Sequence, residues 1–131
     1  FLNFSFNFDS AAGIIYTVDV TKPNGEKITI ISMADGTPFS MDKMYKVALN
    51  SYRGNGGGEL LTKGAGIPQD ELKGRILFST DKDLRYYLMQ YIEKKGVIEP
   101  NALGQWKFIP EEWVEPAAKR DYEYLFGKVE K

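Results

Sequence analysis

Four glycines lie within five positions of this chain, at Gly54, Gly56, Gly57 and Gly58. Glycine loses more conformational freedom on ordering than any other residue, so this cluster disfavours regular structure and favours a loop. The stretch before it, residues 45–50, alternates apolar and polar side chains with the period of a strand. We therefore predict a strand over 45–50 that runs directly into a glycine-rich loop.

Three side chains at the end of that predicted strand form the candidate binding site. Asn50, Tyr52 and Arg53 offer an amide, an aromatic ring and a guanidinium, which together suit a planar, polar ligand. The loop is not a dinucleotide fingerprint, because Glu59 stands where the third glycine belongs, and no Gly-Lys-Ser/Thr follows to make a Walker loop. On residue types alone, a plain glycine-rich turn beside a half-buried Tyr52 remains an open alternative.

The N-terminal third of the chain has the patterns of strands and turns. Residues 1–9 alternate phenylalanine with polar side chains, which predicts a strand with one aromatic face. Residues 14–32 predict a β-hairpin around the Pro-Asn-Gly turn signal at 23–25. Asp19 and Asp35 lie near turns, where a single aspartate ordinarily stabilises the turn itself.

The remaining segments predict an α+β fold. Short helical turns are expected at 59–63 and 68–72, short strands at 75–79 and 106–109, and a last helix that opens at Pro116 and ends at Gly127. Strands mixed with two main helices, without a regular alternation of the two, indicate a mixed or mostly antiparallel sheet.

The strongest helical pattern covers residues 81–95. Ser79 or Thr80 is expected to cap its start, and Gly96 to end it. An apolar stripe with helical spacing runs along it, formed by Leu84, Tyr87, Leu88, Tyr91 and Ile92. We expect this stripe to be buried, so that Leu88→Ala would destabilise the protein by about 2–5 kcal/mol.

The composition excludes several classes of chemistry. The chain has no His and no Cys, which excludes the usual zinc sites and any Ser-His or Cys-His nucleophile. With 17 basic and 18 acidic residues and no basic stripe, it is not expected to bind duplex nucleic acid. No apolar run approaches the length of a membrane span. A chain that begins FLNFSFNF without an initiator Met is expected to be a piece of a longer protein.

The string LNSYRGNGGG, at 49–58, resembles the motif of the C-terminal domain of the 5'-nucleotidase family. The Tyr-Arg pair in it is similar to the 2',3'-cyclic-nucleotide 2'-phosphodiesterase/3'-nucleotidase branch of that family. The upstream stretch FNFDSAAGIIYTVDVTKP and the later QWKFIP resemble the same branch, so the similarity extends over about residues 6–110.

The resemblance implies a division of labour. Residues 1–131 would be part of a nucleotide-binding C-terminal domain, whereas phosphoester hydrolysis would belong to an N-terminal metallophosphoesterase domain outside this chain that holds divalent metal ions. Neither a cofactor nor a catalytic residue is then expected in this chain, which would be inactive alone. The resemblance also implies a periplasmic or extracytoplasmic protein. A non-catalytic binding or interaction module with the same fold is the alternative.

The resemblance also assigns roles to individual residues. Tyr52 matches one of two aromatic rings that clamp the base, and Asn50 matches the first asparagine of the motif. Gly56, Gly57 and Gly58 would bring backbone amides to the nucleotide, and Arg53 would face either the ligand or the partner domain. Gly58 stands where 5'-nucleotidases carry an aspartate, which weakens a strict 5'-nucleotidase specificity and leaves the base and the cleaved phosphate open.

Overall fold

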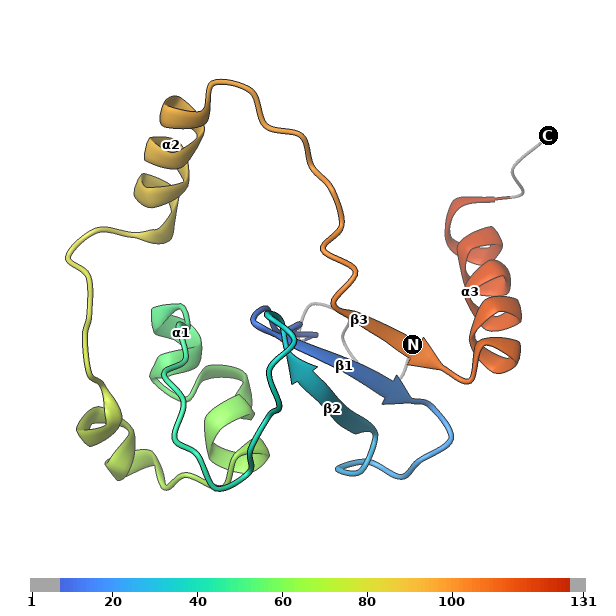
Figure 1. Ribbon diagram of the computed structural model, residues 1–131, viewed down its shortest axis with the longest axis horizontal. Helices are drawn as coiled ribbons and strands as arrows, with labels where there is room; N and C mark the ends of the chain where they lie inside the picture. The colour runs from blue at the N-terminus through green and yellow to red at the C-terminus, as the bar shows by residue number, and fades with distance from the viewer. Residues whose placement is uncertain (1–7, 128–131) are drawn as a thin grey trace. The chain divides into compact units, whose positions relative to one another are not determined.

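The computed structural model describes residues 8–127, which form two compact units. Unit 1 comprises Met44–Asn101 together with Phe8, and unit 2 comprises Asp9–Lys43 and residues 102–127. In the sequence, unit 1 is thus inserted between the two parts of unit 2 (Figure 1). The strand predicted over 1–9 lies outside the described residues except for Phe8 and Asp9, which are not in a strand.

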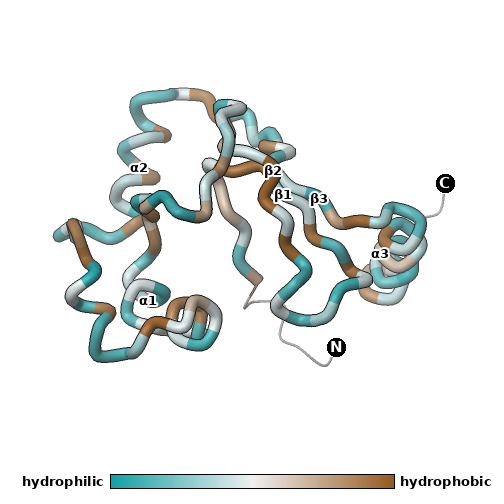
Figure 2. Tube along the Cα trace, turned by 60° about the horizontal axis from the view of Figure 1, so that its bottom comes forward, coloured by the Kyte–Doolittle hydropathy of each residue, from teal (hydrophilic) through white to brown (hydrophobic). Residues whose placement is uncertain are grey.

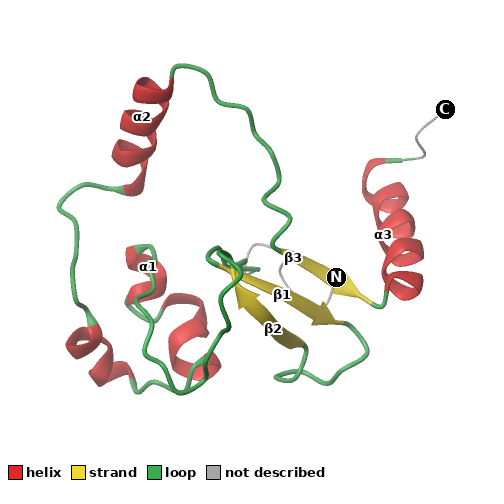
Figure 3. Cartoon of the chain, in the orientation of Figure 1, coloured by secondary structure: helices red, strands yellow, loops and turns green. Residues whose placement is uncertain are grey.

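Unit 2 is built on a three-stranded mixed sheet in the order β2-β1-β3 (Figure 3). Strand β1 (Ile14–Asp19) pairs antiparallel with β2 (Ile28–Met33) and parallel with β3 (Trp106–Ile109). The predicted hairpin over 14–32 and the predicted strand over 106–109 are therefore confirmed, as is the α+β fold class with a mixed sheet.

The two aspartates near the hairpin are turn residues, as predicted. The Asp19 carboxylate accepts hydrogen bonds from the backbone N–H and the hydroxyl of Thr21, at 2.9 and 2.6 Å. Asp35 accepts the same pair of bonds from Thr37, again at 2.9 and 2.6 Å. The hydroxyl bond first, and then the backbone bond, hold the pKa of each carboxyl below its ordinary value of 3.8.

The apolar centre of unit 2 is a group of aromatic rings on β1 and β3. Tyr16 is only 5% exposed, and its ring stacks on that of Trp106 with centroids 6.0 Å apart and planes at 14°. Trp106 in turn meets Phe108 edge to face at 5.0 Å. Because Tyr16 pairs with Trp106 in the sheet and Val18 with Phe108, the parallel pairing places these side chains on one face.

The last helix, α3 (Glu111–Phe126), begins five residues before the predicted start at Pro116. Pro110 is its N-cap residue, and the carboxylates of Glu111 and Glu112 lie in its first turn, where they suit the positive end of the helix dipole. Pro116 therefore lies inside the helix, and the predicted start is wrong. The predicted end at Gly127 is confirmed, because this residue adopts φ 80° and closes the helix.

Unit 1 is helical throughout its regular structure. Its elements are α1 (Ser51–Gly54), the short helices η2 (Gly57–Glu59), η3 (Leu60–Gly64) and η4 (Gln69–Arg75), and α2 (Leu84–Lys95). The predicted helical turns at 59–63 and 68–72 are confirmed as η3 and η4. The strands predicted at 45–50 and 75–79 are wrong, since neither segment joins a ladder among the described residues. An alternating pattern favours a strand only where a partner supplies hydrogen bonds.

Helix α2 has the predicted end but a later start. Its N-cap is Asp83, which accepts a bond from the backbone N–H of Tyr86 at 2.9 Å, in place of the predicted Ser79 or Thr80. Its apolar stripe is not buried as predicted: all five members keep between 41% and 63% of their surface exposed, namely Leu84, Tyr87, Leu88, Tyr91 and Ile92. Helical spacing gathers apolar side chains on one face, but burial also requires a neighbouring apolar surface.

Replacement of Leu88 by Ala should accordingly have a small effect on the stability of this chain. Leu88 is 51% exposed, so its truncation creates no cavity, and we expect a loss of about 0.5 kcal/mol, as for a surface position. Urea denaturation followed by far-ultraviolet circular dichroism measures this. A loss of about 2 kcal/mol or more would show that the stripe is packed after all.

Much apolar surface of the chain remains open. Among the described residues, Tyr16 and Leu72 are the buried hydrophobic side chains, although 43% of the chain is hydrophobic. The accessible surface is 11981 Å². A compact chain of 14.8 kDa should expose about 7,000 Å², and two separate bodies of half that mass about 8,400 Å² together. Figure 2 shows apolar and polar residues interspersed along the strands and helices.

Candidate functional site

The candidate site of unit 1 starts with a helix cap. Asn50 adopts an extended conformation, and its side-chain oxygen accepts a hydrogen bond from the backbone N–H of Arg53 at 2.8 Å. A cap of this kind is worth about 1 kcal/mol. Asn50 therefore caps the start of α1. This helical turn sets the directions in which the side chains of Tyr52 and Arg53 project.

Among the described residues, Arg53 is the charged residue that is buried, with 7% of its surface exposed. Its Nη1 donates to the backbone carbonyl of Gly57 at 3.2 Å, and its guanidinium carbon lies 5.4 Å from the centroid of the Tyr52 ring. The structure thus buries Arg53 within unit 1, where it contacts the Gly57 carbonyl and the Tyr52 ring.

For each of the glycines at 56, 57 and 58, the structure shows why a residue with a side chain would fit poorly. Gly56 and Gly58 adopt φ values of 92° and 68°, which are strained for residues with a side chain. Gly57 has no such φ, but a Cβ there would lie 2.5 Å from Cε2 of the Tyr52 ring and 2.6 Å from the Tyr52 carbonyl oxygen. The predicted loop is therefore a tight turn against Tyr52. It is not irregular throughout, because Gly54 lies in α1 and Gly57 and Gly58 lie in the short helix η2.

Tyr52 is the exposed part of this arrangement. It lies on α1, touches Gly57 along one ring edge and Arg53 through the cation–π contact, and still keeps 62% of its surface exposed. An aromatic ring that is held on one side and exposed on another is suited to stack on a flat ligand. The alternative interpretation expects Tyr52 to be half-buried, whereas most of its surface is exposed in the structure.

Sequence reasoning missed one residue of the site, Gln69 at the start of η4. Its Nε2 donates to the backbone carbonyl of Asn55 at 3.0 Å, and its Oε1 lies close to where a Cβ on Gly56 would be. Fourteen residues separate Gln69 from Asn55, and a polar residue after a proline gives no sequence signal for such a contact.

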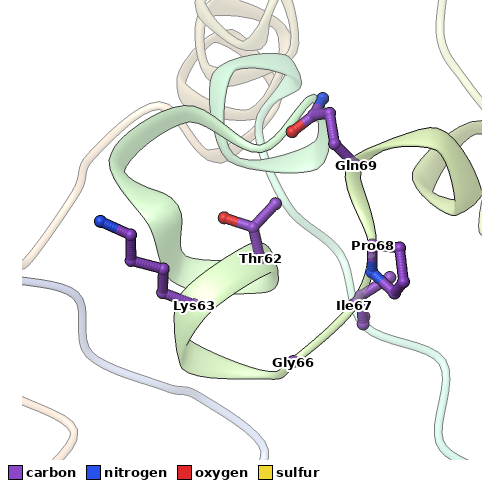
Figure 4. A pocket seen from close by; sticks show the side chains of 6 residues that line it. All are labelled: Thr62, Lys63, Gly66, Ile67, Pro68 and Gln69. Atoms are coloured by element: carbon purple, nitrogen blue, oxygen red, sulfur yellow. The ribbon is translucent and has the colours of Figure 1, made fainter.

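Gln69 also borders an open surface hollow of about 450 Å³ (Figure 4). Thr62 and Lys63 of η3 lie on one side of it, and the segment from Gly66 to Gln69 lies on the other. Lys63 forms an ion pair with Glu59 at 2.7 Å, so its charge is already compensated. The hollow is therefore a neighbour of the glycine loop, with no concentration of charge of its own.

The described residues do not fit a divalent metal ion. No group of three or more His, Cys, Asp or Glu side chains that could hold one occurs among residues 8–127. Within the same residues, no helix is both long and apolar enough to cross a membrane.

Comparison with known proteins finds a family match over part of the chain. Residues 3–63 match the sequence profile described as "5'-nucleotidase, C-terminal domain", a match that includes α1 and the whole glycine loop. This part of the chain is similar to the 5'-nucleotidase C-terminal domain family, as the motif at 49–58 indicated. No solved structure matches the chain significantly.

Two curated relatives extend the similarity beyond the family match. The "Trifunctional nucleotide phosphoesterase protein YfkN" of Bacillus subtilis is 32% identical over 117 residues, covering 81% of this chain and 8% of that protein. The "2',3'-cyclic-nucleotide 2'-phosphodiesterase/3'-nucleotidase" of Haemophilus influenzae is 28% identical over 121 residues, covering 81% of this chain and 17% of that protein. The chain therefore spans less than a fifth of the length of either relative.

Proposed function

We propose that this chain forms part of the nucleotide-binding C-terminal domain of a nucleotidase or 2',3'-cyclic-nucleotide phosphodiesterase, and that Tyr52 stacks on the base. The observation that carries the proposal is the exposed ring of Tyr52 beside the glycine loop. The family match over 3–63 and the phosphoesterase names of both relatives support it.

Several residues of the loop would each contribute to binding of the nucleoside part. Stacking of a base on Tyr52 would contribute about 1–3 kcal/mol, by analogy with other stacking surfaces for nucleic acids. The backbone of Gly56, Gly57 and Gly58 would lie near the polar edge of the nucleotide, because glycines permit close approach. Arg53 and Asn50 would act indirectly, since the first braces Gly57 and the second caps α1.

Hydrolysis would belong to another part of the whole protein. Bound divalent metal ions would supply the Lewis acidity for phosphoester hydrolysis, held by a metallophosphoesterase domain as the family resemblance implies. The described residues do not fit such an ion, so no step of hydrolysis is assigned to them. The whole protein would work outside the cytoplasm.

The open apolar surface supports the view that this chain is one portion of a larger domain. An accessible area of 11981 Å², against about 8,400 Å² even for two separate bodies, leaves apolar faces that further chain would cover. The N-terminal remainder of the C-terminal domain and the metallophosphoesterase domain are the proposed partners.

Substitution of Tyr52 in the whole protein tests the proposed function. Tyr52→Ala should raise KM for nucleotides by about 5- to 150-fold, the factor that corresponds to one lost stacking contact. Tyr52→Phe should change it little, because stacking needs the ring and not the hydroxyl. Steady-state kinetics with a nucleotide and with a small phosphoester that lacks a base measures the difference.

The small phosphoester is the control for folding. Its hydrolysis should be nearly unaffected by both substitutions, because it has no base to stack on Tyr52. Equal losses on both substrates would indicate structural damage, and unchanged nucleotide KM in Tyr52→Ala would refute the assignment.

A further inference from the structure

Gln69 holds the glycine loop from a separate segment. It is the first residue of η4, directly after Pro68, and its side chain reaches back across fourteen residues to the Asn55 carbonyl. Asn55 is the residue that ends α1, so this bond fixes the position where the chain leaves the helix and enters the glycines.

The same side chain occupies the space beside Gly56. Oε1 of Gln69 lies 2.4 Å, and its Cδ 3.2 Å, from the position of a Cβ on Gly56. Gly56, with φ 92°, therefore accommodates the amide group by having no side chain. The Gln69 amide therefore contacts the loop at two neighbouring residues, Asn55 and Gly56.

The constraint passes along the loop to Tyr52. Gly57 follows Gly56 directly and lies against the Tyr52 ring, and its carbonyl accepts the bond from Arg53. Arg53 thus holds Gly57 from one element, and Gln69 holds Asn55 and Gly56 from another. Loss of the Gln69 contact would leave the Arg53 bond and the backbone turn to hold the glycines against the ring.

We propose that Gln69 is a positioning residue for nucleotide binding: its amide fixes the loop Asn55–Gly57 and thereby the orientation of the Tyr52 ring. This rests on the proposed role of Tyr52 as the base contact. Gln69 touches no reacting atom in this account, and it is expected to affect binding of the base and not the chemical step.

Gln69→Glu is the sharpest test, because glutamate has the same size but cannot donate to the Asn55 carbonyl when ionised. The side chain is exposed, so the variant should fold. In the whole protein, we expect about fivefold faster hydrogen exchange at the amides of Gly56 and Glu59, the factor for one lost hydrogen bond. These amides donate to the carbonyls of Arg53 and Gly56, at 3.0 and 3.2 Å.

Kinetics with two substrates separates positioning from general damage. Gln69→Glu and Gln69→Ala should raise KM for nucleotides by about two- to fivefold with kcat unchanged, and should leave hydrolysis of a phosphoester without a base unaltered. Gln90→Glu is the matched control. The Gln90 amide donates to the exposed Glu93 on α2, at 3.3 Å and away from the loop, so this variant should change neither loop exchange nor KM.

Two results would overturn the proposal. Unchanged exchange at Gly56 and Glu59 in Gln69→Glu would show that the amide does not hold the loop. Faster exchange with an unchanged nucleotide KM, in a protein where Tyr52→Ala does raise KM, would show that the loop does not position the ring. A failure of the proposed function can be told apart from these two results. In that case, Tyr52→Ala itself would leave the nucleotide KM unchanged.

Discussion

Tyr16→Ala is expected to destabilise unit 2 by about 3–5 kcal/mol, the range for truncation of a large buried aromatic side chain. Tyr16 lies on the central strand β1, is 5% exposed and stacks on Trp106. Its hydroxyl oxygen also accepts a bond from the backbone N–H of Ala11 at 3.2 Å. Truncation would therefore open the centre of the aromatic group. Urea denaturation followed by near-ultraviolet circular dichroism measures the loss.

Two control variants separate the contributions of Tyr16. Tyr16→Phe keeps the ring and removes only the hydroxyl, so it should cost about 0.5–1.5 kcal/mol. Trp113→Ala removes an exposed aromatic side chain of the same unit and should change stability by no more than about 0.5 kcal/mol. If Tyr16→Ala cost no more than Trp113→Ala, the aromatic group would not be the core of unit 2.

Gly57→Ala is expected to have the largest effect in unit 1, a loss of about 1–3 kcal/mol as for an overpacked position. The added methyl group would lie 2.5 Å from the Tyr52 ring and 2.6 Å from the Tyr52 carbonyl oxygen, so either the ring or the loop has to move. Because the displaced ring is the proposed base contact, nucleotide KM should rise together with the loss of stability. Thermal denaturation and steady-state kinetics measure the two effects.

Gly54→Ala is the matched control for Gly57→Ala. Gly54 lies in α1, has no atoms within 4 Å of an added Cβ and does not have a positive φ. Alanine there should be neutral or stabilise by about 0.4–1 kcal/mol, because it restricts the unfolded chain. Equal effects of the two substitutions would contradict the contact between Gly57 and Tyr52.

The parts of the fold that can be predicted are those with local signals. The hairpin of β1 and β2 follows from alternation around a Pro-Asn-Gly turn, and the ends of α2 and α3 follow from Gly96 and Gly127. The parallel pairing of β3 with β1 could not be predicted, because it joins segments on either side of unit 1. The strand expected at 45–50 is wrong because its alternating pattern is a local signal, and the segment pairs with no other strand among the described residues.

The sequence could predict which segment holds the candidate site, but not which contacts some of its side chains make. Asn50, Tyr52 and the glycines do lie together, because they are neighbours in sequence. Arg53 is expected from the family resemblance to face either the ligand or the partner domain. In the structure, its side chain is buried and donates to the Gly57 carbonyl. A sequence does not show which backbone oxygen a guanidinium will reach, and for the same reason it contains no indication of the contact that Gln69 makes. The ligand contacts themselves stay predictions.

The central claim is that the base of a nucleotide lies on the ring of Tyr52, and intermolecular nuclear Overhauser effects in the whole protein test it most directly. With a non-hydrolysed nucleotide bound, we predict cross-relaxation between the base protons and the ring protons of Tyr52, and its loss in Tyr52→Ala. Gly54→Ala, which leaves the ring in place, should retain the signal. Cross-relaxation from the base to other aromatic rings, with none to Tyr52, would contradict the account.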